Sequence, residues 1–579
     1  MVVHLSVPRG TASDSGAAVN VQAGSTVTIN GGDFLGGKTK TLSSAGTLTV
    51  YGGTFDQDVA YLAEGYKAVE KNGKYVVVSN DVVAVIETAE DLLALSGTKI
   101  AGVYELIADI DLGGAEFKAM SAWYASATFN GNGHTISNAK VVSGDNDNGT
   151  EQASIFFVST NGALTVSDLT LKDLTVETKN IDNGYAAAVV GYCEGKLVLN
   201  NVDVVNASVT GSKSSGMLVG HLTPSGNLTA DGCDVAGSIT ISSFEASGHY
   251  AGEYVGTIAG DTALTACTAK VTLGGNLKST NNGTIYGRKV SGKLTIDGAI
   301  PAATTADLID AIKNAPVGET TTIVLINSVY AGDINITLAA LGKQGGDVVI
   351  KAAKGVSPVI TGMVTLGYRN QGVGAEMYNA NVKFDGVTFE QATANTHSIN
   401  VEDVKSLTLV NCTIINNGEY GIASARGNAT GTSKIENCTF ENAGMQLWGN
   451  YATGLVIDGC TFNNSRINVQ AGNGVTVQKC EFNATLTDAN VGDSFYMIRS
   501  NSTPITVKNC TINVDSTVTG VATNQTKWYL MANRGTTNWT VENVAVTMTD
   551  AALAQTSLLV TACTSTGVIN TANLTVNGK

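Results

Sequence analysis

The sequence has few charged residues, few prolines and no long apolar run. Charged side chains make up only 14% of its 579 residues, and there are six prolines; the charged fraction is low for a soluble protein. No stretch of about 18 apolar residues occurs, so the sequence predicts no membrane-spanning helix. The first ten residues lack a basic segment followed by an apolar one, so they do not predict a secretory signal.

Basic residues are also scarce relative to acidic ones. The chain has 34 Lys and Arg against 49 Asp and Glu, which gives a formal net charge of -15 and a pI of about 4.8. Because phosphate binding relies on clustered Lys and Arg, this balance argues against nucleic acid as a partner. An acidic surface keeps a long, exposed protein soluble, and we expect that role for the excess charge.

Glycine, asparagine and threonine are abundant, with 66 glycines alone, and they favour strands and tight turns over helices. One short phrase recurs five times in the C-terminal half: a cysteine, then Thr or Glu, then Ile or Phe. Each copy follows an alternating strand such as 407–410, whose apolar face can be buried only against the next copy. A period of 20 to 30 residues is typical of a solenoid, and it separates Cys412, Cys438, Cys460, Cys480 and Cys510. The sequence therefore predicts a coil of stacked strands.

These five cysteines occupy one place in the repeat. We expect them to form an inward ladder at about the 4.8 Å spacing of neighbouring strands. Side chains of parallel strands in register point the same way, and a free Cys behaves as a small buried hydrophobe, so we favour packed thiols. A disulfide is compatible with the spacing. A metal site is the third alternative, although no CxxC pair supports zinc.

The chain divides into three predicted blocks. The first is a β-rich stub in which segment 25–34 is echoed by 46–55, with a Gly-Gly pair in each copy. The echo predicts two rungs, followed by a short helical turn near 61–63 and a strand at 74–78. The three blocks are residues 1–83, 84–300 and 301–579.

The second and third blocks each open with a helix start signal. Thr88 is followed three residues later by Asp91, and Thr304 by Asp307, each before an apolar run. This is the capping-box pattern. A short capped helix can cover the exposed end of a coil, which a solenoid needs for solubility. Two capped starts predict two solenoid domains joined near residue 300.

The rungs of residues 301–579 resemble the right-handed parallel β-helix of the pectate-lyase-like superfamily. Block 84–300 resembles the glycine-rich GLUG-type repeat helices of bacterial surface proteins, through the phrases at 109–112 and 130–136. The resemblance implies an all-β fold, with two capped right-handed parallel β-helices in tandem after the N-terminal stub. The same fold carries lyases, hydrolases, adhesins and phage tailspikes, so it does not decide the activity.

The resemblance also implies which residues catalysis would require. Lyases of this fold use an arginine or lysine base, often beside calcium-binding carboxylates, and the related hydrolases place clustered aspartates on neighbouring rungs. No such cluster is evident at outward strand positions, and we predict no catalytic residue, no cofactor and no metal. Asp109 and Asp111 are explained by solvent exposure beside a cap, and the five histidines share no ligand spacing.

Unusual side chains occur on the strands that alternate with the cysteine phrases. If the apolar residues of these strands face inward, their polar and aromatic neighbours project outward from consecutive rungs. Aromatic faces beside amides and guanidinium groups suit sugar rings, so a glycan groove is one hypothesis; packing or subunit contact is the other. The predicted inward residues are Leu447, Val469, Ile498 and Met531. The candidate glycan-binding residues are Trp448, Gln470, Arg499, Arg466, Trp528, Tyr529 and Arg534.

Two classes of function remain. The first is a non-catalytic elongated appendage, adhesin-like or phage fibre-like, which presents a binding surface to a glycan or a host-surface receptor. The alternative is a polysaccharide lyase or hydrolase of the tailspike type. Both place the protein outside the cell, on a bacterial cell surface or a phage virion, and a homotrimer would be typical of the phage case.

Overall fold

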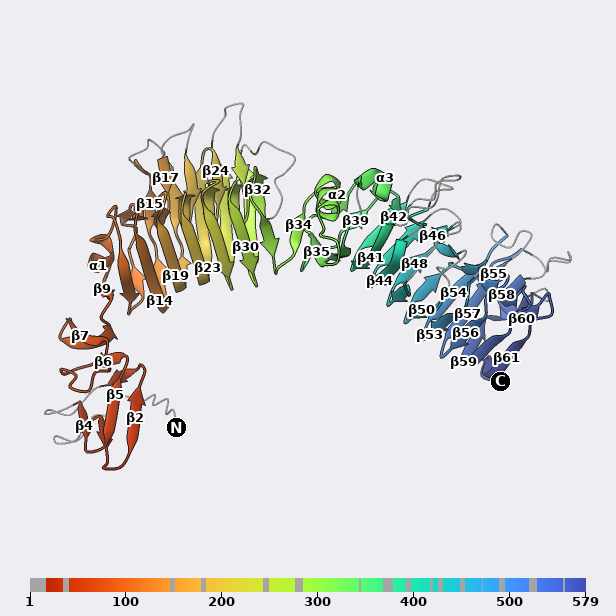
Figure 1. Ribbon diagram of the computed structural model, residues 1–579, viewed down its shortest axis with the longest axis horizontal. Coiled ribbons are helices and arrows are strands. Elements are labelled where there is room, and N and C mark those ends of the chain that lie inside the picture. Colours follow the sequence, from red (N-terminus) through yellow and green to blue (C-terminus); the bar gives the residue numbers. More distant parts are fainter. Residues whose placement is uncertain are drawn as a thin grey trace. The chain divides into compact units, whose positions relative to one another are not determined.

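The computed structural model divides into two compact units, Met1–Asp297 and Gly298–Lys579, and each is described by itself. Stacked strands make up most of both units (Figure 1). The three-block division predicted from the sequence is finer than these units and stays a prediction. The described residues are 17–34, 41–145, 151–178, 184–242, 249–275, 277, 285–342, 345–367, 378–391, 397–402, 404–416, 420–424, 431–447, 453–470, 472–488, 495–519, 528–555 and 558–579.

The first unit begins with two short rungs. Strands of the first rung pair in parallel with their echoes in the second, and Phe34 stacks on Phe55 with ring centres 4.9 Å apart. An antiparallel hairpin that includes the predicted strand at 74–78 then closes this part. The bounds are β1 (Val19–Val21), β2 (Thr26–Ile29), β3 (Asp33–Phe34), β4 (Leu42–Ser44), β5 (Thr47–Val50), β6 (Gly53–Phe55), β7 (Tyr66–Lys71) and β8 (Lys74–Ser79).

The predicted helical turn near 61–63 is wrong. Leu62 forms an isolated parallel bridge with Val50, and the backbone N–H of Ala63 donates to the Val50 carbonyl at 2.9 Å. The segment is extended because its backbone groups pair with the preceding rung instead of with each other.

The rest of the first unit is a coil of parallel rungs. Long strands of one sheet align in register, as in the pairing of β14 with β19 and of β19 with β23. That sheet contains β9 (Val82–Ile86), β10 (Gly102–Leu106), β11 (Ile110–Asp111), β12 (Glu116–Phe117), β14 (Ser126–Ser137), β15 (Lys140–Val142), β19 (Ala163–Lys172), β20 (Thr175–Glu177), β23 (Lys196–Gly211), β26 (Asn227–Asp231), β27 (Asp234–Ile241), β30 (Asp261–Thr265), β31 (Thr268–Gly275) and β33 (Leu294–Ile296).

Two smaller sheets complete the rungs of this coil. The first contains β13 (Met120–Ala122), β18 (Phe156–Val158), β22 (Val190–Cys193), β25 (Val219–Leu222), β29 (Val255–Ile258) and β32 (Tyr286–Lys289). The second contains β16 (Gly144–Asp145), β17 (Glu151–Ala153), β21 (Tyr185–Ala187), β24 (Ser214–Gly216) and β28 (Tyr250–Ala251). Glycines 191, 220 and 256 recur at one position of the rung, where a Cβ would lie about 2.5 Å from neighbouring atoms. Only glycine fits that approach.

The second unit is a longer coil, whose described strands form two sheets. In the larger, nineteen-stranded sheet most rungs contribute two consecutive strands. Its strands are β34 (Ile300–Ala302), β35 (Thr320–Leu325), β36 (Val329–Tyr330), β38 (Asp347–Ala352), β39 (Val359–Ile360), β41 (Tyr378–Asp385), β42 (Thr388–Gln391), β44 (Val404–Val410), β45 (Thr413–Asn416), β47 (Lys434–Glu436), β48 (Thr439–Glu441), β50 (Leu455–Asp458), β51 (Thr461–Asn463), β53 (Val475–Gln478), β54 (Glu481–Leu486), β56 (Ile505–Lys508), β57 (Thr511–Ser516), β59 (Trp539–Met548) and β61 (Ile569–Val576).

The third strand of each rung lies in the nine-stranded sheet. Its strands are β37 (Ile334–Ile336), β40 (Val364–Leu366), β43 (Ile399–Val401), β46 (Tyr420–Ser424), β49 (Gly444–Leu447), β52 (Ile467–Val469), β55 (Tyr496–Ser500), β58 (Trp528–Asn533) and β60 (Leu558–Cys563). Neighbouring strands pair in parallel. The apolar sides of both sheets meet in one continuous core.

Short helices occur where the sequence places start signals. In α1 (Ala89–Leu93) and α2 (Thr305–Lys313), the N-cap threonine and the aspartate at the third helical position make the reciprocal bonds of a capping box, as predicted. The apolar side of α2 covers the first rung of the second unit, with Leu308 and Ile312 fully buried. Two shorter helices are α3 (Leu338–Leu341) and α4 (Asp550–Leu553).

The cysteine ladder lies in the core of the second unit, as predicted. All five cysteines are free thiols with exposures of 1–2%. The backbone N–H of Cys438 lies 3.4 Å from the Cys460 sulfur on the next rung. Beside them, Phe462 stacks between Phe440 and Phe482, with ring centres 4.7 Å apart on both sides. Packed thiols are therefore confirmed over disulfides.

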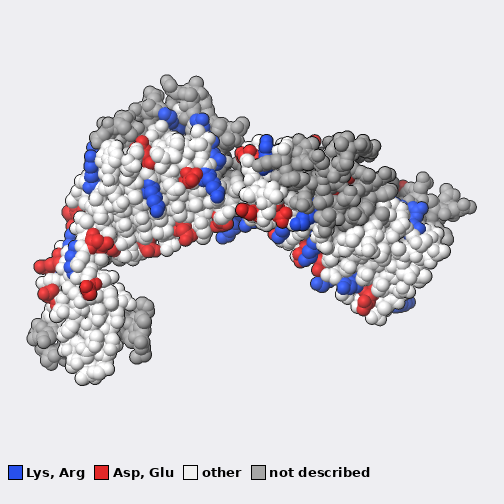
Figure 2. Space-filling model, in the orientation of Figure 1, with Lys and Arg blue, Asp and Glu red and all other residues white. Residues whose placement is uncertain are grey.

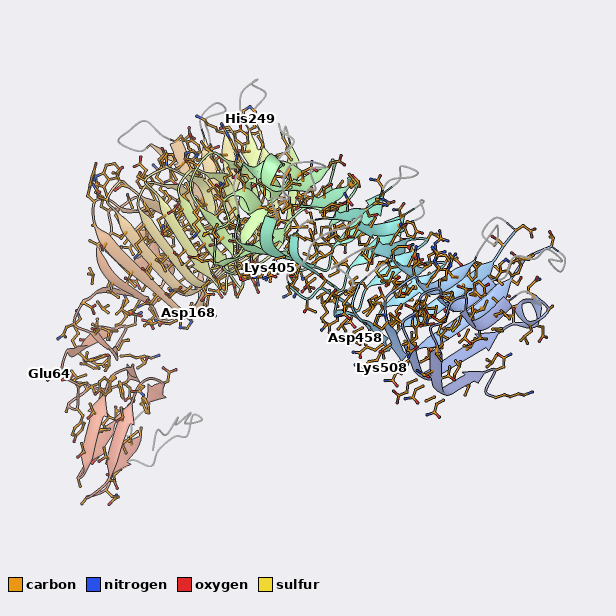
Figure 3. The ribbon with its side chains drawn as sticks, turned by 45° about the vertical axis from the view of Figure 1, so that its right-hand side comes forward. Glu64, Asp168, His249, Lys405, Asp458 and Lys508 are labelled. Carbon is orange, nitrogen blue, oxygen red and sulfur yellow. The ribbon has the colours of Figure 1, made fainter. Side chains whose placement is uncertain are left out.

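The surface is mostly uncharged (Figure 2), as the low charged fraction implies. On the nineteen-stranded sheet, Asp458, Gln478 and Lys508 follow one another in register on neighbouring rungs. Figure 3 labels the first and the last of them. The amide of Gln478 donates to Asp458 at 2.8 Å. Such cross-strand pairs stabilise the outer face while keeping it polar.

Candidate functional site

The outer face of the nine-stranded sheet carries a stack of aromatic and cationic side chains from three rungs. The hydroxyls of Tyr420 on β46 and Tyr496 on β55 lie 3.2 Å apart, although 76 residues separate them. Arg466, just before β52, places its guanidinium carbon 5.3 Å from the Tyr420 ring centre and 5.0 Å from that of Tyr496. Arg499 on β55 lies 4.0 Å from the Tyr496 ring. We call these four residues the Tyr–Arg stack.

Asn468 on β52 lies beneath the Tyr–Arg stack and orients two of its members. Its side-chain oxygen accepts a hydrogen bond from Nε of Arg499 at 3.2 Å, and its amide nitrogen donates to the Tyr420 hydroxyl at 3.4 Å. Asn468 is only 1% exposed. A buried amide with both ends bonded fixes its partners in place.

The electrostatics of the Tyr–Arg stack centre on Arg499. Burial lowers the pKa of its half-buried guanidinium below the usual range, and the positive charges of Arg534 and Arg466 lower it further. The rings of Tyr496 and Tyr420 act in the opposite direction. Among the described residues, Arg499 forms no ion pair. A positive charge held in this way favours an anionic group close by.

The two tyrosines of the Tyr–Arg stack are buried, and their hydroxyls are hydrogen-bonded. Burial raises the pKa of Tyr420, and the hydrogen bond with the Tyr496 hydroxyl raises it further. Tyr420 and Tyr496 are 5% and 3% exposed. Tyr420 therefore stays protonated near neutral pH and serves as a hydrogen-bonding and stacking group.

The structure divides the predicted site residues into several groups. Arg466 and Arg499 belong to the Tyr–Arg stack, and Arg534, which follows β58, is exposed near it. The side chain of Gln470 accepts a hydrogen bond from the amide of Asn501 on the next rung. Tyr529 is half-buried on β58. Trp448 lies outside the described residues.

One predicted site residue is almost fully buried. Trp528 is 2% exposed and belongs to the core of the second unit, so its indole offers little surface to a ligand.

The strand register differs from the one predicted for the row of outward residues. The residues predicted to face inward do so, since Leu447, Val469, Ile498 and Met531 are all core residues. However, Arg499 pairs with Asn468 and not with Gln470. The outward row is therefore Gln446, Asn468 and Arg499, and Gln470 pairs sideways with Asn501.

Sequence reasoning missed Tyr420, Tyr496 and Asn468. The two tyrosines each begin a strand of the nine-stranded sheet, and this shared position was the available signal. Nothing in the sequence shows that their hydroxyls meet across the intervening rungs.

The predicted absence of a metal site stays a prediction. Within the described part of the chain, no group of three or more His, Cys, Asp or Glu side chains is arranged to hold a metal ion. Asp109 accepts a bond from the backbone of Thr135 at 2.9 Å, and Asp111 accepts one from Asn138 at 2.9 Å. Both carboxylates therefore serve as hydrogen-bond acceptors for groups of the next rung. No helix among the described residues is long and apolar enough to cross a membrane.

The parallel rungs, the inward ladder and the capped first turn define a β-solenoid. Residues 397–556 match the protein family described as a right handed beta helix region, and the predicted right-handed parallel β-helix is thereby confirmed for this part of the chain. No curated protein matches the chain. Among solved structures, the pectin methylesterase from Aspergillus niger in deglycosylated form shares 12% identity over 48% of this chain and 86% of its own, with a TM-score of 0.26.

Proposed function

We propose that the protein is a non-catalytic surface or virion appendage that binds glycans on the outer face of its nine-stranded sheet. The observation that carries this proposal is the half-buried guanidinium of Arg499, stacked on Tyr496 and without an ion pair among the described residues. Aromatic rings bind the apolar CH face of a sugar, and guanidinium groups bind its oxygen atoms.

The charge of the Tyr–Arg stack narrows the kind of glycan. Arg499, Arg466 and Arg534 bring three positive charges to one part of a protein whose formal net charge is -15. An anionic ligand relieves the repulsion among them, and a planar guanidinium suits a carboxylate or sulfate. We therefore expect glycans with acidic sugars to bind in preference to neutral ones at this site.

The appendage role belongs to the same proposal. A coil of repeated rungs offers a rigid scaffold whose surface can be varied without changing the core. We place the protein outside the cell, on a bacterial surface or a phage virion, with a host glycan or surface receptor as partner. A homotrimer belongs to the phage alternative. The mass of the full chain in solution, measured by light scattering, tests it, and a monomer would favour the cell-surface alternative.

A glycan array tests the binding site directly. The full chain and its Arg499→Ala variant are applied to an array that includes uronate-containing and sulfated glycans. Removing the guanidinium should weaken binding roughly tenfold, equivalent to about 1.4 kcal/mol. Lys508→Ala is the matched control, since it removes one positive charge from the nineteen-stranded sheet. Equal binding by wild type and Arg499→Ala on every glycan would refute the proposed site.

A second function is favoured by the geometry of Arg499, whose guanidinium lies 4.0 Å from the Tyr496 ring, together with the burial that lowers its pKa. An arginine can act as a general base only when its proton is held less tightly than usual. In a polysaccharide lyase of the tailspike type, Arg499 would remove a proton from the sugar ring. Uronate polysaccharides should then give unsaturated products that absorb in the ultraviolet. If wild-type protein binds uronate polysaccharides and releases no unsaturated product, the lyase function is excluded and the appendage function is retained.

A further inference from the structure

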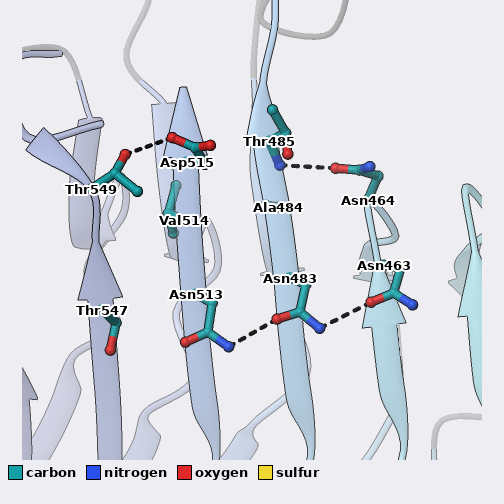
Figure 4. Close-up of a pocket in the computed structure, with 10 residues that line it drawn as sticks. All are labelled: Asn463, Asn464, Asn483, Ala484, Thr485, Asn513, Val514, Asp515, Thr547 and Thr549. Atoms are coloured by element: carbon teal, nitrogen blue, oxygen red, sulfur yellow. Dashed lines mark hydrogen bonds between the residues drawn. The ribbon is translucent and has the colours of Figure 1, made fainter. Parts of the chain in front are cut away.

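A separate hollow lies on the nineteen-stranded sheet. It has a volume of about 380 Å³ and is open to solvent on the outer face of β51, β54, β57 and β59 (Figure 4). Two columns of outward side chains form its walls. Its lining residues are Asn463, Asn464, Asn483, Ala484, Thr485, Asn513, Val514, Asp515, Thr547 and Thr549. None of these belongs to the Tyr–Arg stack.

The space exists because of the alternation along the strands. Ala484 and Val514 lie between the two columns, and their exposures are only 7% and 3%. Successive side chains of a strand point to opposite faces, so these two point into the core. No side chain of β54 or β57 therefore fills the space between the columns.

One wall is a ladder of asparagine amides. The amide nitrogen of Asn483 donates to the side-chain oxygen of Asn463 at 2.9 Å, and that of Asn513 donates to Asn483 at 2.8 Å (Figure 4). An amide has two N–H groups and two acceptor positions. At Asn483 the ladder uses one of each, which leaves one donor and one acceptor for a ligand. Because the ladder fixes the amides, a ligand loses little affinity to ordering them.

The opposite wall is made of hydroxyl and carboxylate groups. The hydroxyl of Thr549 donates to Asp515 at 2.6 Å, and Asn464 accepts a bond from the backbone N–H of Thr485 at 2.9 Å. Figure 4 shows Thr485 and Asp515 side by side on neighbouring strands. Together the two walls offer donors and acceptors at close spacing, which is the pattern that the hydroxyls of a sugar ring can match.

The charge around the hollow is negative. Hydrogen bonds from Thr549 and from the backbone of Ser516 hold the pKa of Asp515 below its usual range. Glu441 and Glu481 accept bonds from the two ends of the amide ladder, at 2.6 and 3.2 Å. No Lys or Arg is among the residues that line the hollow. Acidic ligands are therefore repelled, whereas neutral ones are not.

We propose that this hollow is a second binding site, which takes a short segment of a neutral saccharide. Its volume falls in the lower part of the range of about 300 to 1,000 Å³ typical of ligand sites. The lining residues include no aromatic ring, so affinity comes from hydrogen bonds and is modest. The coil thus has two faces with opposite charge preference, an arginine-rich one and a carboxylate-flanked one.

The test uses the full chain and a panel of neutral oligosaccharides built from glucose, galactose, mannose and N-acetylglucosamine. Thr485→Trp fills the hollow and should reduce binding of a neutral member at least tenfold. Thr506→Trp, at an outward position of β56 on the same sheet, is the matched control and should leave it unchanged. Arg499→Ala should also leave it unchanged, which separates this site from the Tyr–Arg stack.

Two further variants cover the case in which Thr485→Trp does not fold. Thr485→Val keeps the shape, removes the hydroxyl and should weaken the same binding by about threefold. Asp515→Asn keeps the acceptor for Thr549 but removes the charge. It is tested in the Arg499→Ala background, which weakens binding at the Tyr–Arg stack, and should there raise the binding of oligogalacturonate relative to Arg499→Ala alone. Absence of neutral-saccharide binding across the panel, or binding that none of the Thr485 variants changes, would overturn the proposal.

Discussion

Single residues of the cysteine phrases are constrained by backbone conformation. The residue before each ladder cysteine has a positive φ, between 53° and 65°. Asn and Gly accept this left-handed region most readily. Four of the five rungs use them, and the fourth rung uses Lys479, with φ at 54°.

Lys479→Asn should therefore stabilise the second unit, by about 1 kcal/mol, since a non-Gly residue held there costs of that order. Its ion pair with Asp458 is long, at 3.6 Å, and the lysine side chain is largely exposed, so the pair contributes little. Thermal unfolding measures the difference. The reverse change, Asn509→Lys, is the matched control and should lower the melting temperature. A melting temperature of Lys479→Asn equal to or below that of wild type would contradict this account.

Buried thiols should resist chemical modification. Burial raises the pKa of Cys193 to about 12, so below that pH its thiol stays protonated and unreactive. Cys563 is exposed. In native protein at neutral pH, a thiol reagent followed by mass spectrometry should label Cys563 and leave Cys193 and the ladder cysteines unmodified until denaturant is added. Labelling of the ladder at the rate of Cys563 would be inconsistent with the packed core.

Glu253 should make the first unit less stable as pH rises. Burial raises its pKa to about 7, whereas an unfolded glutamate titrates near about 4.3. Between these two pH values the folded state keeps the proton and the unfolded state loses it. The contribution of Glu253 to the free energy of unfolding is therefore complete below the lower pKa and is lost as pH rises through the upper one.

Comparison of melting temperatures tests this contribution. Glu253→Gln should reduce the fall in melting temperature between about pH 5 and about pH 8. Glu90→Gln, at an exposed position of α1, should leave the fall unchanged. An identical fall in wild type and Glu253→Gln would argue against a buried, protonated carboxyl.

At the scale of elements, α2 closes one end of the second unit. Thr304→Ala removes the side chain that accepts from the Asp307 backbone at 3.1 Å, and should destabilise the unit by about 1 kcal/mol. Thr304→Ser keeps the cap and should stay close to wild type. Denaturant unfolding followed by circular dichroism measures both. Equal stabilities for the Ala and Ser variants would mean that the cap is not needed.

Elements with a local signal could be predicted from the sequence. The capping boxes at Thr88 and Thr304 and the ladder from Cys412 to Cys510 depend on neighbours a few residues away or on a repeat. The register of β52 against β55 could not be predicted, because 27 residues separate Val469 from Tyr496 without a repeat to align them. The contact of Tyr420 with Tyr496 depends on that register.

At the scale of the whole molecule, the two units have their own cores. The core of the second unit consists of residues from Ala302 onward. Residues 298–579, expressed alone, should therefore fold with a β-type circular dichroism spectrum and one cooperative transition. Under the proposed function, this fragment should bind the same acidic glycans as the full chain. A fragment without a cooperative transition would show that the second unit needs the first.

The unequal spacing of the cysteines has a consequence for how such a chain can diversify. Successive steps range from 20 to 30 residues, yet the flanking strands remain in register. Differences in rung length therefore lie between the paired strands, and they do not disturb the cysteine ladder. A rung of the second unit can therefore change in length while the pairing of its neighbours is kept. Rungs can thus differ in length and in their outward side chains while they share one core.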